Sequence, residues 1–172
     1  MMIKKIFLIA LLLGGALWYW HERTTLSEGK ILAYYDQVGE VLEARDPDGL
    51  CKLLADDYQG IDSSSFGEEQ GAERQFDKTQ ACNATREMYA RFNGADKNVS
   101  SLLNLKYSYK VNNIKISPDK NTATVDVSYS LATAGNFMQI ESHSIDTLIR
   151  KKGQTLLLKS QSETVVTVVN RV

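Results

Sequence analysis

Apolar residues in the first half of the chain recur every three or four positions, which predicts helices. The first such stretch precedes residue 46 and places its apolar positions on one helical face: Ile31, Tyr34, Tyr35, Val38, Val41 and Leu42. Thr25 and Glu28 have the spacing of a capping box at its start. We therefore expect a long amphipathic first helix whose apolar face packs on the rest of the domain.

Asp46-Pro47 ends this helix and begins a second, short one. Proline suits the first helical position, and aspartate can cap the helix just before it. The buried positions of the short helix are expected to be Leu50, Leu53 and Leu54. Tyr58 and Ile61 then predict a brief extended segment.

Residues 63–75, "SSSFGEEQGAERQ", show no periodicity and predict a long loop. Such a loop is either a lid over a pocket or a connecting segment without a function of its own. Asp77 and Gln80 mark the start of a third helix, which runs to about Phe92. Its apolar stripe is Ala81, Thr85, Met88 and Phe92.

After residue 102 the pattern changes to the alternation of strands, in four segments. Leu105, Tyr107, Tyr109 and Val111 alternate with polar residues, and the phase slips at Asn112-Asn113, which predicts a bulge. The second segment spans residues 122–133, the third 137–151 and the fourth 155–169, with turns at "SPDKN" and "KKGQ". Three helices followed by long strands predict an α+β fold, with the helices packed on one face of a curved antiparallel sheet.

One further hydrophobic helix is predicted in front of this domain. Lys4 and Lys5 precede an uncharged run from Ile6 to Trp20. If Trp18-Tyr19-Trp20 is an interfacial aromatic belt, the run stays as a membrane anchor; if the small residues up to Ala16 form a cleavage site, it is a removed signal peptide. Both interpretations divide the chain into an export segment at 1–23 and a domain at 24–172, and both place that domain outside the cytoplasm.

Composition excludes several classes of protein. The 172-residue chain has a formal net charge of -1, which argues against nucleic acid or an anionic lipid surface as the main partner. A hydrophobic fraction of 43% with two prolines excludes a disordered chain.

Cys51 and Cys82 fall on the second and third predicted helices. An even number of cysteines in an oxidising compartment favours one disulfide, which would tie these helices together. Two separately buried thiols are the alternative. No metal site is expected, because no pair of histidines accompanies the cysteines.

The order of these elements resembles that of the NTF2-like (SnoaL-like, cystatin-like) superfamily over about residues 26–169. The likeness rests on the long first helix, on "DPDGLCKLLADDYQGID", and on the hairpins "NNIKISPDKNTATVDVSYSL" and "HSIDTLIRKKGQTLLLKSQSE". It implies a cone that is open at one end. Because this superfamily contains isomerases, cyclases and dehydratases as well as adaptors and periplasmic domains without chemistry, the resemblance does not imply one function.

The export segment together with this resemblance indicates a bacterial protein. We expect it in the inner membrane, through a single span at residues 6–20 with the domain in the periplasm, or secreted to the periplasm if cleaved near Ala16. This arrangement resembles the bitopic subunits of type IV secretion systems, which implies a protein partner in the cell envelope. Superfamily members also imply a homodimer through the sheet.

Candidate catalytic residues are Asp57, Glu141 and His143, the last being the one histidine of the folded domain. The strand that carries His143 has polar and apolar residues on both sides, so periodicity does not reveal which side faces inward. If the odd-numbered side faces in, Glu141 and His143 line a polar cavity; if the even-numbered side does, His143 lies on the surface.

Asp57 follows Asp56 at a helix end, where a solvated carboxylate is the ordinary interpretation. Asp126 lies opposite Val125 and Val127 and is expected to face solvent. The candidate ligand pocket consists of Tyr34, Tyr35 and Tyr58, for which core packing is the alternative role.

The sequence therefore predicts a binding or assembly module of the bacterial envelope, without a recognisable catalytic motif and without a cofactor. One alternative is an isomerase, cyclase or dehydratase that uses a polar pocket in the cone. The other is a carrier of hydrophobic ligands, for which a large dry cavity is expected.

Overall fold

The computed structural model describes residues 15, 22–66, 69–93, 105–133 and 138–168. Apart from Gly15, the hydrophobic run at residues 6–20 lies outside the described residues. Within the described part of the chain, no helix is both long and apolar enough to cross a membrane.

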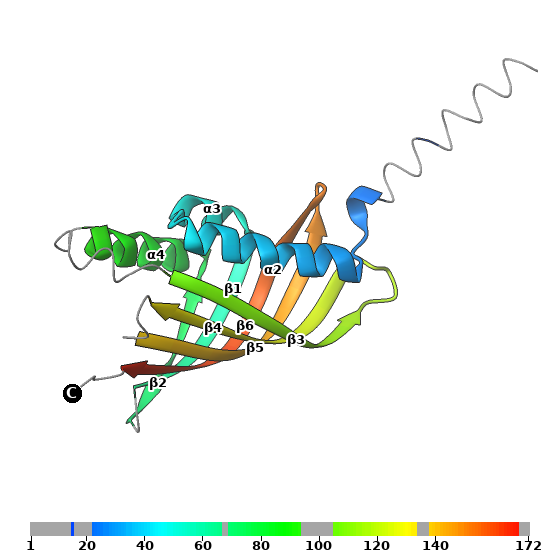
Figure 1. Cartoon of the computed structure of the whole chain (residues 1–172). Coiled ribbons are helices and arrows are strands. Elements are labelled where there is room, and N and C mark those ends of the chain that lie inside the picture. The colour runs from blue at the N-terminus through cyan, green and yellow to red at the C-terminus, as the bar shows by residue number, and fades with distance from the viewer. Residues whose placement is uncertain (1–14, 16–21, 67–68, 94–104, 134–137, 169–172) are drawn as a thin grey trace, which may run out of the picture.

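The domain is α+β, with a curved six-stranded sheet and three helices on its concave side (Figure 1). The helices are α2 (Glu28–Glu43), α3 (Pro47–Lys52) and α4 (Lys78–Asn93). The strands are β1 (Leu54–Phe66), β2 (Glu69–Asp77), β3 (Leu105–Ile116), β4 (Thr122–Thr133), β5 (Met138–Lys151) and β6 (Gln154–Val168). Their order across the sheet is β2-β1-β6-β5-β4-β3.

Two of the predicted helix starts are confirmed. Asp46 accepts a hydrogen bond from the Gly49 amide at 2.8 Å, with Pro47 in the first turn of α3. Asp77 and Gln80 bond each other's backbone amides at the start of α4, at 2.8 and 3.0 Å. The predicted cap of α2 is wrong, because Ser27, and not Thr25, accepts the Lys30 amide.

The expectation of a loop at residues 63–75 is wrong. Most of this segment is strand, in the second half of β1 and in β2, which pair antiparallel from Gln59↔Asp77 to Phe66↔Glu69. On its other edge β1 pairs with β6, from Gln59↔Lys159 to Phe66↔Val166. β1 is hydrogen-bonded on both edges and β2 on one, and this pairing holds the polar sequence extended although its side chains show no strand alternation.

The β1·β6 pair is parallel, so the sheet is mixed and not wholly antiparallel as predicted. The other four pairs of neighbouring strands are antiparallel. The predicted bulge in β3 is confirmed, since the register with β4 shifts between Val111 and Asn113. The β5–β6 turn places Lys152 and Gly153 at φ values of 53° and 84°, which is the pattern of a type I′ hairpin.

The main core lies between α2 and the centre of the sheet. Its buried residues are Leu26, Ile31, Tyr34, Tyr35, Leu53, Ala123, Val125, Val127 and Leu148. A second cluster joins α3, β1 and α4 through Cys51, Leu54, Tyr58 and Cys82. Between these two clusters the helices do not close fully onto the sheet, which leaves a cavity.

Candidate functional site

A cavity of about 500 Å³ lies between the three helices and the concave face of the sheet. Its walls are mostly apolar or aromatic and come from every helix: Tyr34, Val38 and Leu42 from α2, Leu50 and Cys51 from α3, and Ala81, Thr85 and Met88 from α4. Tyr58, Tyr107, Tyr129, Leu131, Ile140 and Leu157 add to these walls from the sheet. We call this space the cone cavity.

The even-numbered side of β5 faces the helices, which settles the question left open by the sequence. Ser142, Ser144, Asp146 and Leu148 are buried, whereas Glu141, His143 and Ile145 are exposed. The neighbouring strand β6 behaves likewise, with Ser162 and Val166 buried between exposed residues. The inner face of β5 and β6 is thus a stripe of hydroxyl groups around one carboxyl.

Asp146 is the centre of this stripe and is only 4% exposed. Its Oδ1 accepts hydrogen bonds from Ser144 at 2.6 Å and Ser160 at 2.8 Å. Its Oδ2 accepts one from the Tyr35 hydroxyl at 2.9 Å. Burial raises the pKa of Asp146 above its ordinary value, and these three hydrogen bonds offset part of that rise.

A second carboxyl, Asp62 of β1, also lines the cone cavity. Its Oδ1 accepts hydrogen bonds from Ser162 at 2.7 Å and Thr164 at 2.8 Å. The Ser142 Oγ lies 3.1 Å from Thr164 Oγ1, so the row of hydrogen-bonded hydroxyl groups continues onto β5. The cavity therefore combines apolar walls with two carboxyl groups on its sheet side.

Several tyrosines line the cone cavity together with these carboxyls. Burial is the main cause of the raised pKa of Tyr34, Tyr35, Tyr58 and Tyr107, and the negative charge of Asp146 adds to it in each case. Burial also raises the pKa of Tyr129 to about 12. These phenols remain protonated at neutral pH and can donate hydrogen bonds inside the cavity.

The structure places the three tyrosines predicted for the pocket along the cone cavity. Tyr34, Tyr35 and Tyr58 all line it and are all buried. Tyr35 is the one whose hydroxyl bonds Asp146. Tyr58 contacts Phe76 of β2, with ring centroids 6.1 Å apart.

The three candidate catalytic residues lie outside this cavity. Glu141 and His143 are on the outer face of the sheet, because β5 turns its even-numbered side inward. The side chain of His143 is 52% exposed, and its Nε2 lies 2.8 Å from Asp126 Oδ1. Asp57 is exposed on β1, next to Asp56, which pairs with Lys78. None of the three is brought together with Tyr34, Tyr35 or Tyr58.

The predicted disulfide is confirmed. Cys51 of α3 and Cys82 of α4 are bonded, with Cα atoms 5.5 Å apart, and both line the cone cavity. The bond therefore joins two helices that form one wall of the site.

The two carboxyls at the centre of the site, Asp62 and Asp146, were not among the predicted site residues. Asp146 shares its side of the strand with Ile140 and Leu148, but the other side carries Phe137 and Ile145, so the pattern gave no decisive signal. Asp62 gave no signal, since it belongs to a segment whose strand structure depends on β2 and β6. In the part of the chain that the structure describes, no cluster of three or more histidine, cysteine or carboxylate groups could hold a metal ion.

Comparison with known proteins shows the fold. No family model and no curated protein matches the sequence. An NTF2-like protein of unknown function from Pseudomonas putida superimposes with a TM-score of 0.53 at 11% identity, covering 79% of this chain and 84% of that one.

Two further solved structures carry names that suggest enzymes. A ketosteroid isomerase-like protein from Erwinia carotovora atroseptica gives a TM-score of 0.51 at 9% identity, over 81% of this chain and 98% of that one. A protein provisionally named scytalone dehydratase, from Novosphingobium aromaticivorans, gives a TM-score of 0.54 at 12% identity, over 83% of this chain and 87% of that one. At these identities the likeness establishes an NTF2-like fold and carries no activity over to this chain.

Proposed function

We propose that the domain binds a small, mostly apolar molecule in the cone cavity and holds the polar group of that molecule on Asp146. The observation that carries this proposal is an apolar cavity of about 500 Å³ with a buried carboxyl on its sheet side. This volume lies within the usual range for small-molecule sites, which are largely apolar with a few placed polar groups.

The hydrogen bonds of Asp146 support this role. A carboxylate offers about four acceptor positions. Ser144 and Ser160 occupy two of them on Oδ1, and Tyr35 occupies one on Oδ2. Among the described residues no donor takes the remaining position on Oδ2, so the preferred ligand carries a hydroxyl or N–H group on an apolar body.

The cavity itself favours small-molecule binding over a purely structural assembly role. An assembly module is expected to fill its cone with side chains and to expose an apolar patch on the outer sheet. Here the cone is open, and the exposed large apolar residues on the outer side of β5 and β6 are Ile145 and Val165, next to His143 and Glu163.

A neutral fluorescent probe, N-phenyl-1-naphthylamine, tests the proposal through a pair of matched variants. Ala81 lines the cavity, whereas Ala90 lies on the exposed side of the same helix. We expect Ala81→Leu to occupy the cavity and to weaken probe binding at least tenfold, and Ala90→Leu to bind the probe like wild type. Equal binding by both variants would place the probe elsewhere and contradict the proposal.

The anchoring role of Asp146 is tested with 1-benzylnaphthalene, in which a methylene replaces the N–H of the probe. Losing a hydrogen bond to a buried carboxylate is expected to weaken binding by roughly tenfold or more. Equal affinity for the two compounds would show that Asp146 holds no polar group of the ligand.

Proton transfer on the bound molecule is a second candidate function. It is supported by the raised pKa of Asp146, because a buried carboxyl with a free acceptor position is a better base than a solvated one. The test is deuterium uptake at C2 of 1-tetralone in D₂O. Asp146 would take the C2 proton and the enolate would receive a deuteron, so wild type accelerates exchange and Asp146→Asn does not. No acceleration by wild type would remove this candidate.

We also propose that the domain lies outside the cytoplasm, directed there by the segment at residues 6–20, which acts either as a membrane anchor or as a signal peptide. The basic start and the uncharged run of this segment support the proposal, and so does the Cys51–Cys82 disulfide, since such bonds persist in oxidising compartments. Fractionation of expressing cells, with mass spectrometry of the N-terminus, tests it. An intact chain in the membrane fraction supports an anchor, and a chain cut near Ala16 supports a signal peptide. A soluble cytoplasmic chain with both thiols reduced would contradict both.

A further inference from the structure

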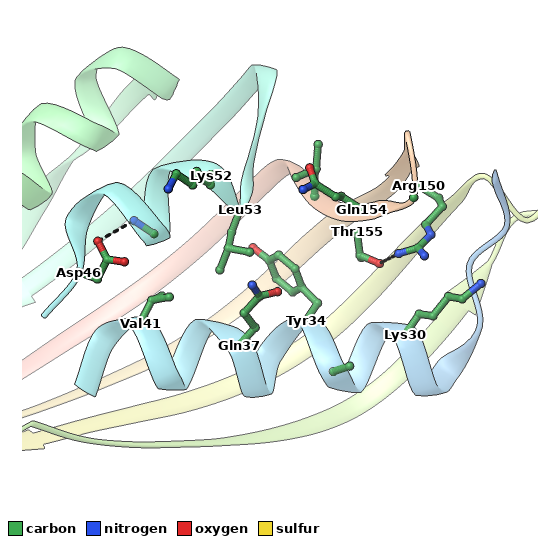
Figure 2. Close-up of a pocket in the computed structure, with 14 residues that line it drawn as sticks. Lys30, Tyr34, Gln37, Val41, Asp46, Lys52, Leu53, Arg150, Gln154 and Thr155 are labelled. Atoms are coloured by element: carbon green, nitrogen blue, oxygen red, sulfur yellow. Dashed lines mark hydrogen bonds between the residues drawn. The ribbon is translucent and has the colours of Figure 1, made fainter. Parts of the chain in front are cut away.

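A second cavity, of about 520 Å³, is lined by Tyr34 and by residues of α2, α3 and the β5–β6 hairpin (Figure 2). It is bounded by one side of α2, by α3 and by the start of β6, and we call it the hairpin cleft. Its polar lining includes Lys30, Gln37, Lys52, Arg150 and Thr155, and its apolar lining includes Val41, Leu53 and Leu156. Tyr34 lines both cavities.

Arg150 is the unusual group of this cleft. The structure gives its guanidinium one hydrogen bond, from Nη1 to Thr155 Oγ1 at 2.9 Å. Its Nε is buried and is without a hydrogen-bond partner among the described residues. A buried donor without a partner costs free energy and requires an explanation, such as a ligand or an ion.

The charge of Arg150 is also not neutralised by a contacting carboxylate. It takes part in none of the ion pairs of the described residues, and Glu22 attracts it only from beyond ion-pair distance. Burial lowers the pKa of this guanidinium. Arg150 is partly buried, and an arginine that is shielded from water usually has a carboxylate or phosphate partner.

The other charged groups of the cleft do not supply that partner. Lys30 is held by Glu22 at 2.6 Å and also donates to two backbone carbonyls. Asp46 is engaged at the start of α3, where its Oδ1 accepts the Gly49 amide. Lys52 is exposed and adds a further positive charge.

We propose that the hairpin cleft binds an organic anion, whose carboxylate or phosphate group pairs with the guanidinium of Arg150. The planar guanidinium offers five donors and matches the oxygens of either group. Gln37 adds an amide from α2, and Val41, Leu53 and Leu156 give a short apolar surface for the rest of the ligand. This site is separate from the cone cavity and does not depend on the function proposed for it.

The experiment follows backbone amide resonances of the whole chain while sodium phosphate and sodium octanoate are added in separate titrations. We expect saturable shifts at Gln37, Gln154 and Thr155. Saturation by phosphate alone identifies a phosphate ligand, and saturation by octanoate identifies a carboxylate ligand. The absence of saturable shifts with both anions would overturn the proposal.

Three variants assign the binding to Arg150. Arg150→Gln is expected to weaken anion binding by roughly tenfold to a hundredfold, because it removes a charged hydrogen-bond donor. Arg150→Lys keeps the charge without the planar fork and should fall between Gln and wild type. Lys159→Gln removes one positive charge from an exposed position of β6 and should bind like wild type. Equal affinity of Arg150→Gln and wild type would contradict the proposal, and Arg150→Lys supplies the same comparison if the glutamine variant does not fold.

The titration also separates this site from the cone cavity. Octanoate that enters the cone cavity would shift Leu131 and Ile140 and would be unaffected by Arg150→Gln, a result that would overturn the assignment to the cleft. The naphthylamine probe tests the cone cavity alone. If it failed to bind, the phosphate titration would still decide whether the hairpin cleft binds an anion.

Discussion

At the scale of single residues, Asp146 is the buried carboxyl group around which the proposed site is built. It places a carboxyl group in an apolar interior, and three hydroxyl donors recover part of the desolvation cost. The remaining cost appears as a raised pKa, which makes the stability of the fold depend on pH. This dependence can be measured without knowledge of a ligand.

The Asp146→Asn variant isolates the part of this pH dependence that comes from Asp146. Because the pKa of Asp146 is raised in the folded state, the folded chain binds the proton more tightly than the unfolded chain, whose carboxyl titrates near 3.8. The contribution of Asp146 to stability is therefore full below pH 3.8 and is lost as the pH rises through the folded-state pKa. We expect the free energy of unfolding of wild type, relative to Asp146→Asn, to fall as the pH increases from about 3.5 to 7 in urea titrations. A constant difference between the two proteins, or one that grows with pH, would contradict this.

At the scale of elements, α2 both packs in the main core and forms a wall of the cone cavity. It carries two glycines in different surroundings. Gly29 is exposed, and a β-carbon there would have no neighbour within 4 Å. Gly39 is buried, and a β-carbon there would lie 2.7 Å from Cδ1 of Tyr107. Gly39 thus lets β3 bring the Tyr107 ring close to the helix and against the cone cavity.

The two glycines make a matched pair for alanine substitution. We expect Gly29→Ala to raise the free energy of unfolding by about 0.4–1 kcal/mol, the usual gain where alanine fits the backbone conformation of a glycine. Gly39→Ala should lower it by about 1–2 kcal/mol, because the displaced Tyr107 ring outweighs the helical gain. Chemical denaturation of both variants measures the difference. A stabilising Gly39→Ala would show that the ring moves at no cost.

A covalent bond and an exposed ion pair join α3 to α4. Arg86 of α4 donates to Asp48 of α3 at 2.8 Å. The Tyr89 hydroxyl of α4 donates to the Leu42 carbonyl of α2 at 3.1 Å. The Cys51–Cys82 disulfide fastens α4 directly to α3. Since both helices line the cone cavity, this bond holds one wall of the site in place.

Replacement of both cysteines by serine should lower the free energy of unfolding by about 3–4 kcal/mol, the chain-entropy value for a loop of this length. Amide exchange in α4 is expected to increase more than exchange in β4 and β5, because α4 loses its covalent attachment to α3 and keeps, among the described polar contacts, only the exposed Arg86–Asp48 ion pair with it. Wild type treated with a phosphine reductant serves as the control and should behave like the double variant. Unchanged stability would mean that noncovalent packing alone holds α4.

At the scale of the whole molecule, the segment before α2 closes the narrow end of the cone. The Leu26 amide donates to the Lys120 carbonyl in the β3–β4 turn, and the Gly153 amide of the β5–β6 turn donates to the Arg23 carbonyl at 3.1 Å. The Leu26 side chain is 2% exposed and belongs to the main core. One short segment therefore fastens two hairpins and the first helix together.

Leu26→Ala tests this closure, with Leu32→Ala as its control. Removing the buried side chain should cost about 2–5 kcal/mol. Leu32 is 41% exposed on α2, and its replacement should cost less than about 1 kcal/mol. Thermal and urea unfolding give both values. Similar losses in the two variants would show that Leu26 has no special role at the narrow end.

The sequence by itself determined the local features of this protein. The amphipathic stripe of α2, the caps at Asp46 and Asp77, and the bulge before Asn113 are all set by neighbours within a few positions, so periodicity and turn chemistry reveal them. The alternation of β4 also revealed its inner face, because Val125 and Val127 are apolar and Asp126 between them is polar.

Only the tertiary structure decided which polar groups meet in the cavity. Both sides of β5 mix polar and apolar residues, so the inward position of Asp146, and not of His143, depends on pairing with β4 and β6 and on the cover of α2. Asp62 reaches the site because β1 pairs with β6, about 100 residues away along the chain, and no local pattern encodes that pairing. Long-range strand pairing, absent from the local sequence pattern, placed both carboxyls of the site.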